Sequence, residues 1–140
     1  MSTDAHPFLS RLQQATNLHD LDALVDCFAP DYRNEAPAHP SRSFEGREQV
    51  RSNWQQIFTF VPDVRSRVLG FAAHGPEVWS EWEMSGTRID GTPHRMRGVI
   101  VFGLREERAA WARFYLEPVE QGSATVDDAV RAQVHAGDPT

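Results

Sequence analysis

The sequence contains no lysine, and all 14 of its basic residues are arginine. Chemistry that begins with a Schiff base on a lysine amine is therefore excluded. Acidic residues outnumber basic ones, 20 against 14, so the net charge is -6. An acidic surface repels nucleic-acid phosphates and anionic lipid. We therefore expect neither nucleic acid nor a membrane surface as a partner.

Cysteine and long apolar runs are also scarce. Cys27 is the only cysteine, so no internal disulfide can form. It lies in an apolar helical pattern, where a buried thiol without a reactive role is expected. The first ten residues lack the pattern of a signal peptide, and no apolar stretch reaches the ~20 residues of a membrane span. We expect a reduced, soluble, cytoplasmic protein.

Sequence patterns for a metal or a cofactor are missing as well. The six histidines show neither His-x-x-x-His nor His-x-His spacing. Glu81 and Glu83 could bind a metal together with a distant histidine, but we expect no metal site. The glycine in GLREER precedes a strand rather than a helix, so it does not form a phosphate-binding loop. We expect no cofactor.

The 140 residues suit one domain with a substantial core. Apolar residues at helical spacing predict helices over about 6–18, 19–30 and 45–63. Residues 31–40 predict a short strand that runs into a proline-rich loop. From 64 to 120 only strand signals follow, separated by turns at HGPE, DGTP and REER. Helices followed by an antiparallel meander indicate an α+β domain.

A last amphipathic helix is predicted near the C-terminus, where Thr125 and Asp128 resemble a capping box. Such a helix could cap a cavity, bind a second subunit or fray. We expect a single domain over residues 1–140, with a core at about 6–119 and this helical tail at about 124–136.

The stretch EVWSEWEM, residues 77–84, alternates as a strand does. One face is apolar enough for a core and consists of Val78, Ser80, Trp82 and Met84. The opposite face consists of Glu77, Trp79, Glu81 and Glu83. This second face is either solvent-exposed surface or the wall of a polar pocket.

The order and spacing of several segments resemble the SnoaL-like branch of the nuclear transport factor 2-like superfamily. The segments run from about Leu12 to Val119 and are NLHDLDALVDCFAPDY, FEGREQVRSNW, EWEMSGTRIDGTP, GVIVFGL and WARFYLEP. The resemblance implies a cone-shaped α+β barrel, in which a strongly curved, mostly antiparallel sheet encloses a pocket that three helices close. Many members are homodimers. Ketosteroid isomerases, limonene-epoxide hydrolases and polyketide cyclases share the fold with non-catalytic proteins, so the fold does not determine the function.

The catalytic groups of the ketosteroid isomerases are missing here. The resemblance carries their general base to Ala36, one residue after Glu35. Their tyrosine falls on Leu12, and their protonated aspartate falls near Ile100. That activity is therefore not expected.

The hydrolase groups are missing at the matching positions too. Their Arg-x-Asp falls on Glu81-Trp82-Glu83, their second aspartate on Phe114, and their water-holding Tyr and Asn on Arg33 and Glu35. Since such positions face the pocket in the hydrolases, the resemblance implies that the glutamates of EVWSEWEM point inward. Trp82 would then lie on the outer face, where it could meet a second subunit.

Glu81 and Glu83 are the first catalytic candidates. Burial in an apolar pocket would raise the pKa of a carboxylate into the range useful for a general acid or base. The side chains expected to line this pocket are Trp54, Phe58, Trp79, Ile100 and Phe114. The alternative is an exposed strand face or ion pairs with Arg97 or Arg113.

Glu35 and His39 lie in NEAPAHP, which the resemblance places at the pocket mouth. Glu35 could accept a proton, with His39 as its partner or a ligand contact. Arg33 could bind an oxyanion of the ligand. The alternatives are a loop glutamate, a solvated histidine and an arginine that neutralises the glutamates.

The sequence thus predicts an acid/base enzyme, with Glu81, Glu35 or Glu83 as the base. Its substrate would be a small hydrophobic carbonyl or epoxide compound, in an isomerase, cyclase or hydrolase reaction. The alternative is a non-catalytic ligand-binding or dimerisation module. Convergence of Glu81 and Glu35 on one cavity without arginine contacts would support the enzyme, whereas exposed or ion-paired glutamates would support the module. In either case we expect a homodimer.

Overall fold

The computed structural model of the protein describes residues 6–135. Its helices are α1 (Pro7–Asn17), α2 (Leu21–Asp26), α3 (Arg47–Phe60) and α4 (Val126–Val134), with a 3-10 turn η2 (Pro40–Arg42). Its strands are β1 (Phe28–Glu35), β2 (Phe44–Glu45), β3 (Arg65–His74), β4 (Glu77–Thr87), β5 (Pro93–Arg105) and β6 (Arg108–Pro118).

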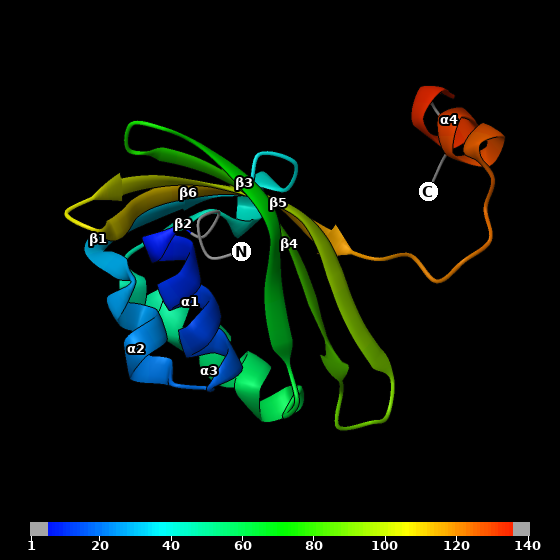
Figure 1. Ribbon diagram of the computed structural model, residues 1–140. Coiled ribbons are helices and arrows are strands. Elements are labelled where there is room, and N and C mark those ends of the chain that lie inside the picture. The colour runs from blue at the N-terminus through cyan, green and yellow to red at the C-terminus, as the bar shows by residue number, and fades with distance from the viewer. Residues whose placement is uncertain (1–5, 136–140) are drawn as a thin grey trace.

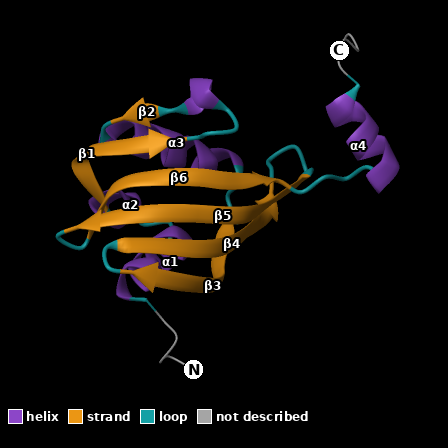
Figure 2. Cartoon of the chain, turned by 90° about the horizontal axis from the view of Figure 1, so that it is seen from above, coloured by secondary structure: helices purple, strands orange, loops and turns teal. Residues whose placement is uncertain are grey.

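The six strands form one sheet in the order β2-β1-β6-β5-β4-β3 (Figure 2). The strands β3 to β6 are an antiparallel meander, and β1 runs parallel to β6. The sheet curls around α1, α2 and α3, which all lie on its concave side (Figure 1). The expected α+β class, with a curved and mostly antiparallel sheet around three helices, is confirmed.

The boundary between the second helix and the first strand differs from the prediction. The helix ends at Asp26, and Phe28, which lies inside the predicted helix 19–30, is the first residue of β1. Pro30 is tolerated inside β1 because the pairing of β1 with β6 is interrupted between Phe28 and Arg33. A proline has no N–H to give to a ladder, so it fits such a gap.

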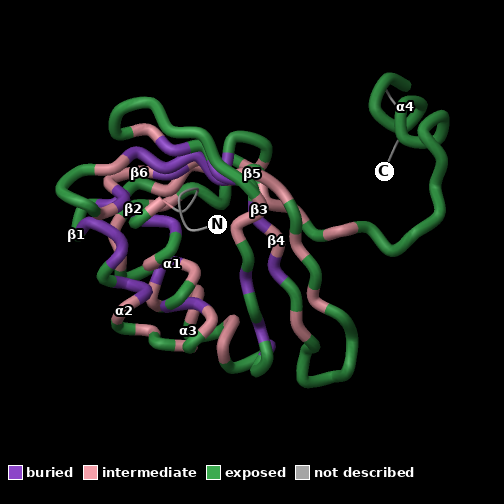
Figure 3. Tube along the Cα trace, viewed as in Figure 1, coloured by how far each residue is buried: buried purple, intermediate pink, exposed green. Residues whose placement is uncertain are grey.

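The core fills the space between the helices and the concave face of the sheet (Figure 3). Leu9 of α1 and Leu24 of α2 are buried against it, as are Tyr32 of β1, Trp82 of β4 and Phe102 of β5. The inner faces of three strands and two helices therefore share one apolar interior, and its unfilled part is where a ligand could fit.

The C-terminal helix α4 lies apart from the rest of the domain (Figure 1). Its predicted capping box is present, since Thr125 Oγ1 accepts from the Asp128 N–H and the Asp128 carboxylate accepts from the Thr125 N–H. Val126, Val130 and Val134 are all exposed. Residue 136, the end of the tail as predicted, is outside the described residues. None of the helices described is long and apolar enough to cross a membrane.

Candidate functional site

The orientation of β4 is the reverse of the one that the resemblance implied. Its buried side chains are Val78, Ser80, Trp82 and Met84, which face the helices. The opposite face of β4 lies on the convex side of the sheet. Trp82 is therefore an interior residue, and the glutamates that we expected to look inward look outward.

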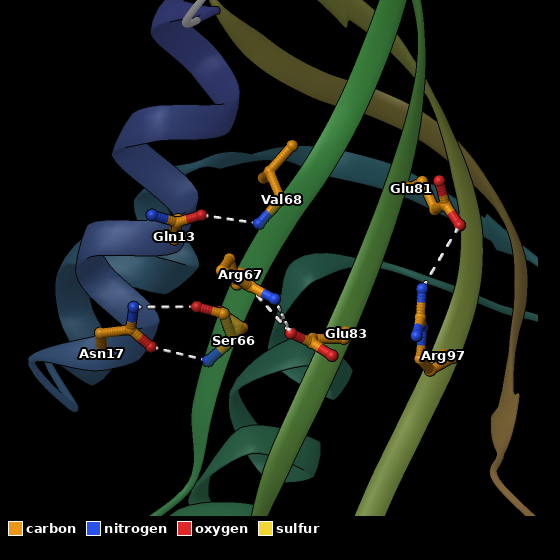
Figure 4. A network of polar contacts seen from close by, with 8 residues as sticks. All are labelled: Gln13, Asn17, Ser66, Arg67, Val68, Glu81, Glu83 and Arg97. Carbon is orange, nitrogen blue, oxygen red and sulfur yellow. Dashed lines mark hydrogen bonds and ion pairs between the residues drawn. The ribbon is translucent and has the colours of Figure 1, made fainter. Parts of the chain in front are cut away.

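The outward glutamates of β4 are paired with arginines of the neighbouring strands. Glu81 lies next to Arg97 of β5, with Oε2 3.8 Å from Nη2 (Figure 4). The Glu81 side chain is 54% exposed. Glu83 Oε1 accepts a hydrogen bond of 2.9 Å from Arg67 Nε on β3. Neither carboxylate is desolvated and unpaired, as a general base in an apolar pocket would be.

Glu35, Arg33 and Trp79 also lie on the convex side. Arg33 Nη1 is 3.8 Å from Glu35 Oε2, and the two side chains are about half exposed. Trp79 is 48% exposed and donates from its indole nitrogen to Glu77 Oε1. None of these residues reaches the concave side, because odd-numbered residues of β1 and β4 share the outer face of the sheet.

A cavity of about 280 Å³ lies between α3 and the concave face of the sheet, and we call it the outer cavity. Most of its wall is apolar, and its polar residues come from five segments. The lining residues are Phe28, Tyr32, Asn34, Ala36, His39, Arg42, Val50, Asn53, Trp54, Ile57, Met84, His94, Met96, Phe114, Leu116 and Glu117.

A second cavity of about 50 Å³, the inner cavity, lies next to it. Five side chains line both cavities, namely Phe28, Trp54, Met84, Phe114 and Leu116. The other residues of the inner cavity are Leu12, Thr16, Ser66, Trp82, Ile100, Phe102 and Glu83, which is the one outward glutamate of β4 that also borders this cavity. The two cavities thus form neighbouring compartments of one interior space, with a polar edge on the outer one.

His39 and Glu117 form a histidine–carboxylate pair at the outer cavity. His39 Nε2 lies 3.2 Å from Glu117 Oε1 and 3.1 Å from Oε2. Because a carboxylate can only accept, Nε2 carries the shared proton and Nδ1 is left as the basic nitrogen of the neutral ring. The pair joins the loop after β1 to the end of β6.

Tyr32 and Asn34 face the same cavity from β1. The Tyr32 hydroxyl donates to Asn34 Oδ1 at 2.6 Å. Burial raises the pKa of Tyr32, so its hydroxyl keeps its proton and stays a donor. With Oδ1 engaged, the NH₂ group is the part of the Asn34 side chain left to contact a ligand.

His94 completes the polar lining from the start of β5. Its Nε2 is buried and has no hydrogen-bond partner among the described residues. Burial, and secondarily the charge of Arg88, lower the pKa of His94 below the ordinary 6.5. The imidazole is therefore neutral at neutral pH and can accept or donate one hydrogen bond to a ligand.

Ser66 lies where α1 supports the edge strand β3. Asn17 bonds both backbone groups of Ser66, at 2.7 Å to its N–H and 3.0 Å to its C=O, and Gln13 Oε1 accepts from the Val68 N–H at 2.7 Å (Figure 4). These amides satisfy the free edge of β3 and fix the position of Ser66. Its own hydroxyl is buried without a partner in the described part of the chain.

Four of the predicted ligand-contact residues reach the cavities. His39 lines the outer one, Ile100 the inner one, and Trp54 and Phe114 line both. Phe58 instead packs against Trp54 and stacks on His19, with ring centroids 4.5 Å apart. The roles of all these residues in binding remain predictions.

Sequence reasoning missed Tyr32, Asn34, Ser66, His94 and Glu117. A local signal existed for the first two, because the Tyr and Asn expected at positions 33 and 35 are present one residue earlier. Nothing local marks the others, since His39 and Glu117 are 78 residues apart in the sequence. Over residues 6–135, no group of three or more His, Cys, Asp or Glu side chains could hold a metal ion.

Comparisons with known proteins agree with this fold. The family model of the SnoaL-like domain matches residues 9–112. Comparison with curated proteins finds no match. Among solved structures, a Catenulispora acidiphila protein with a ketosteroid isomerase-like fold, in complex with trimethylamine, is 19% identical with a TM-score of 0.67, over 78% of this chain and 85% of that one.

Two further structures show the same fold. IdmH of Streptomyces antibioticus, described as a candidate polyketide cyclase, is 22% identical with a TM-score of 0.67, over 78% of this chain and 88% of that one. The LEH-like epoxide hydrolase of M. tuberculosis is 16% identical with a TM-score of 0.68, over 82% and 84%.

Proposed function

Because the chain belongs to the SnoaL-like family, we propose that it is a proton-transfer enzyme acting on a small, mostly apolar carbonyl compound. The observation that carries this proposal is the His39–Glu117 pair, 3.1 Å apart at the edge of a mostly apolar cavity. A histidine titrates near neutral pH, and a carboxylate that holds one ring nitrogen leaves the other free to exchange protons. The glutamates expected to be the base do not share this position.

In the proposed reaction His39 removes a proton from the carbon next to the substrate carbonyl. The electron pair moves to the carbonyl oxygen and gives an enolate, while Glu117 stabilises the imidazolium that forms. The proton returns to carbon at the same or a conjugated position. No atom or electron leaves the pair of reactants, so the reaction needs no cofactor.

The developing enolate charge needs hydrogen-bond donors, and besides Arg42 and Asn53 the lining of the outer cavity offers two whose environment is defined. The NH₂ group of Asn34 is held in place by the Tyr32 hydroxyl, and neutral His94 has an unpartnered Nε2. Donors that are oriented before the reaction stabilise such a charge without reorganisation. Limonene-epoxide hydrolases use two aspartates, whereas Glu117 is the one carboxylate among the residues described as lining this cavity. The pattern therefore favours a carbonyl over an epoxide.

The test is hydrogen exchange at the carbon next to a carbonyl. A panel of apolar ketones is incubated with the protein in D₂O, and deuterium uptake is followed by NMR. His39→Gln and Glu117→Gln should lower the catalysed rate by roughly 10²- to 10⁴-fold, the usual contribution of a general base. Glu81→Gln is the matched control and should leave the rate unchanged, because Glu81 is exposed on the other side of the sheet.

Equal exchange rates in the wild type, His39→Gln and Glu117→Gln would refute the proposal. The unfolding midpoint of each variant must be measured alongside, since a loss of folded protein also lowers the rate.

A non-catalytic ligand-binding module is the second candidate. It is supported by the outward, arginine-paired positions of Glu81, Glu83 and Glu35, which we had named as the sign of a module. If ketones bind but their hydrogen exchange is no faster than in buffer alone, the result would support the binding module.

A homodimer remains a proposal, and the convex face of the sheet is the surface that supports it. Trp79 and Tyr115 are 48% and 42% exposed there, and Arg113 stacks on Trp111 at 4.7 Å. The pairing of β4, β5 and β6 puts Val99 between Glu81 and Tyr115. An aromatic centre with a rim of charged pairs is typical of protein interfaces.

Cytoplasmic location and the lack of nucleic-acid or membrane partners also stay predictions.

A further inference from the structure

Buried polar side chains without a hydrogen-bond partner are rare in folded proteins, and each one calls for an explanation. In residues 6–135 such atoms belong to three residues, Arg11, Ser66 and His94. Two of the three line the cavities, with His94 in the outer one and Ser66 in the inner one. Each compartment of the binding space therefore contains one buried polar group without a partner among the described residues.

Ser66 is the more informative of the two. It is 5% exposed, and its backbone is fixed on both sides by Asn17. The other buried hydroxyls of the inner wall and its surroundings are satisfied, because Thr16 Oγ1 donates to Leu12 O and Ser80 Oγ donates to Ile100 O. Ser66 Oγ is thus a polar point in a wall that is otherwise made mostly of apolar side chains.

We propose that Ser66 is a specificity residue that binds a second oxygen on the substrate, at the end opposite to the carbonyl. The inference rests on the proposed use of the outer cavity for the carbonyl group. The substrate class is then an elongated apolar molecule with a carbonyl at one end and a hydroxyl or keto oxygen at the other. Such a molecule would satisfy the Ser66 hydroxyl, which an all-carbon tail would leave unpaired.

The register of the sheet shows how far apart Asn34 and Ser66 lie along its surface. They are four strand steps apart in the order β1-β6-β5-β4-β3, or about 19 Å across the strands at about 4.8 Å a step. The row of paired residues through Asn34 meets β3 at Ala73, seven residues from Ser66, so the two residues are also displaced along the strands. The direct path across the concave side is shorter than this path along the curved sheet. The inner cavity of about 50 Å³ has room for roughly three to five groups of the size of a water molecule.

The probes are matched pairs of a 2-alkanone and the 2-alkanone of equal length that carries a terminal hydroxyl. Binding is followed through tryptophan fluorescence, because Trp54 and Trp82 line the inner cavity. The quantity compared is the ratio of the two Kd values, ketone over hydroxy-ketone, at each chain length. Ser66→Ala should lower this ratio by about 2- to 12-fold at lengths that reach the inner cavity, the range for one hydrogen bond.

Two further variants separate a binding role from a structural one. Ser66→Thr keeps the hydroxyl and should retain the preference for the hydroxy-ketone. Ser52→Ala removes an exposed hydroxyl from α3 and should change nothing. At short chain lengths Ser66→Ala should not differ from the wild type, which controls for a general loss of stability.

A ratio that Ser66→Ala leaves unchanged at every length overturns the inference, and so does a series in which no member binds. The result is independent of the exchange test. If the ligands bind with the predicted ratio of Kd values but no deuterium exchange occurs, the proposed enzymatic function is refuted and the Ser66 subsite is supported. If exchange occurs but the ratio does not depend on Ser66, the enzymatic function is supported and the subsite is refuted.

Discussion

The indole nitrogen of Trp82 donates a hydrogen bond of 2.8 Å to Ser80 Oγ on the concave face of the sheet. Ser80 Oγ in turn donates 2.7 Å to the carbonyl of Ile100 on β5. This short relay lets a tryptophan with a polar nitrogen lie almost fully buried behind the inner cavity. It also fixes the ring plane that forms part of the cavity wall.

Removal of the relay should destabilise the protein. Ser80→Ala leaves the buried indole N–H without an acceptor, and we expect a loss of about 1–3 kcal/mol in the free energy of unfolding. Urea unfolding followed by circular dichroism measures it. Ser85→Ala, an exposed serine of the same strand, should change stability by less than about 0.5 kcal/mol. Equal effects of the two substitutions would show that the relay contributes nothing.

Neutralising the outward glutamates should have little effect on stability. In Glu81→Gln and Glu35→Gln the lost contacts are ion pairs of 3.8 Å between exposed side chains. Such pairs contribute little in water, so urea unfolding should shift by less than about 0.5 kcal/mol in either variant. A gain of about 1 kcal/mol or more would instead indicate a buried carboxylate held at a cost, and would restore these residues as candidates for the base.

The strand pattern and the resemblance gave opposite answers for β4, and the strand pattern was right. Alternation alone put Val78, Ser80, Trp82 and Met84 on the face suited to a core, and these side chains are buried. The distant resemblance instead implied that this face points outward. Because side chains alternate with a period of two, an alignment error of one residue reverses every side chain of a strand.

The same error explains why part of the site was predicted and part was missed. On β1 the inward residues are Tyr32 and Asn34 rather than positions 33 and 35. The helices and the succession of the meander strands along the chain were predictable because their signals are local. The His39–Glu117 pair and the unpartnered Ser66 hydroxyl depend on how the curved sheet brings distant segments together, which no spacing in the sequence records.

Substitution on the convex face should dissociate the proposed homodimer. Trp79→Arg replaces the indole in the aromatic surface formed with Tyr115 by a charged side chain, whose desolvation in an interface is costly. Sedimentation velocity should show a dimer for the wild type and a monomer for the variant at micromolar concentration. Leu18→Arg, at an exposed position after α1, should leave the dimer intact. A monomeric wild type would refute the proposed interface.

Acid should weaken the fold partly through His94. Burial lowers the pKa of His94 below the ordinary 6.5, so between these two values the unfolded chain binds a proton that the folded chain does not. Stability should therefore fall as the pH falls through about 6.5, and the loss should continue down to the lowered pKa of the folded state. Above 6.5 both states are neutral, and His94 should add no pH dependence.

The measurement is the urea midpoint at closely spaced pH values between 8 and 5. His94→Gln should show a shallower loss below pH 6.5 than the wild type, whereas His74→Gln, at an exposed position, should follow the wild-type curve. Some slope should persist in His94→Gln, because burial also lowers the pKa of His6. A ligand that hydrogen-bonds the neutral His94 should steepen the wild-type curve, because it favours the unprotonated folded state. An unchanged slope in His94→Gln would show that His94 titrates alike in the folded and unfolded chain, and would remove it from the donors proposed for the enolate.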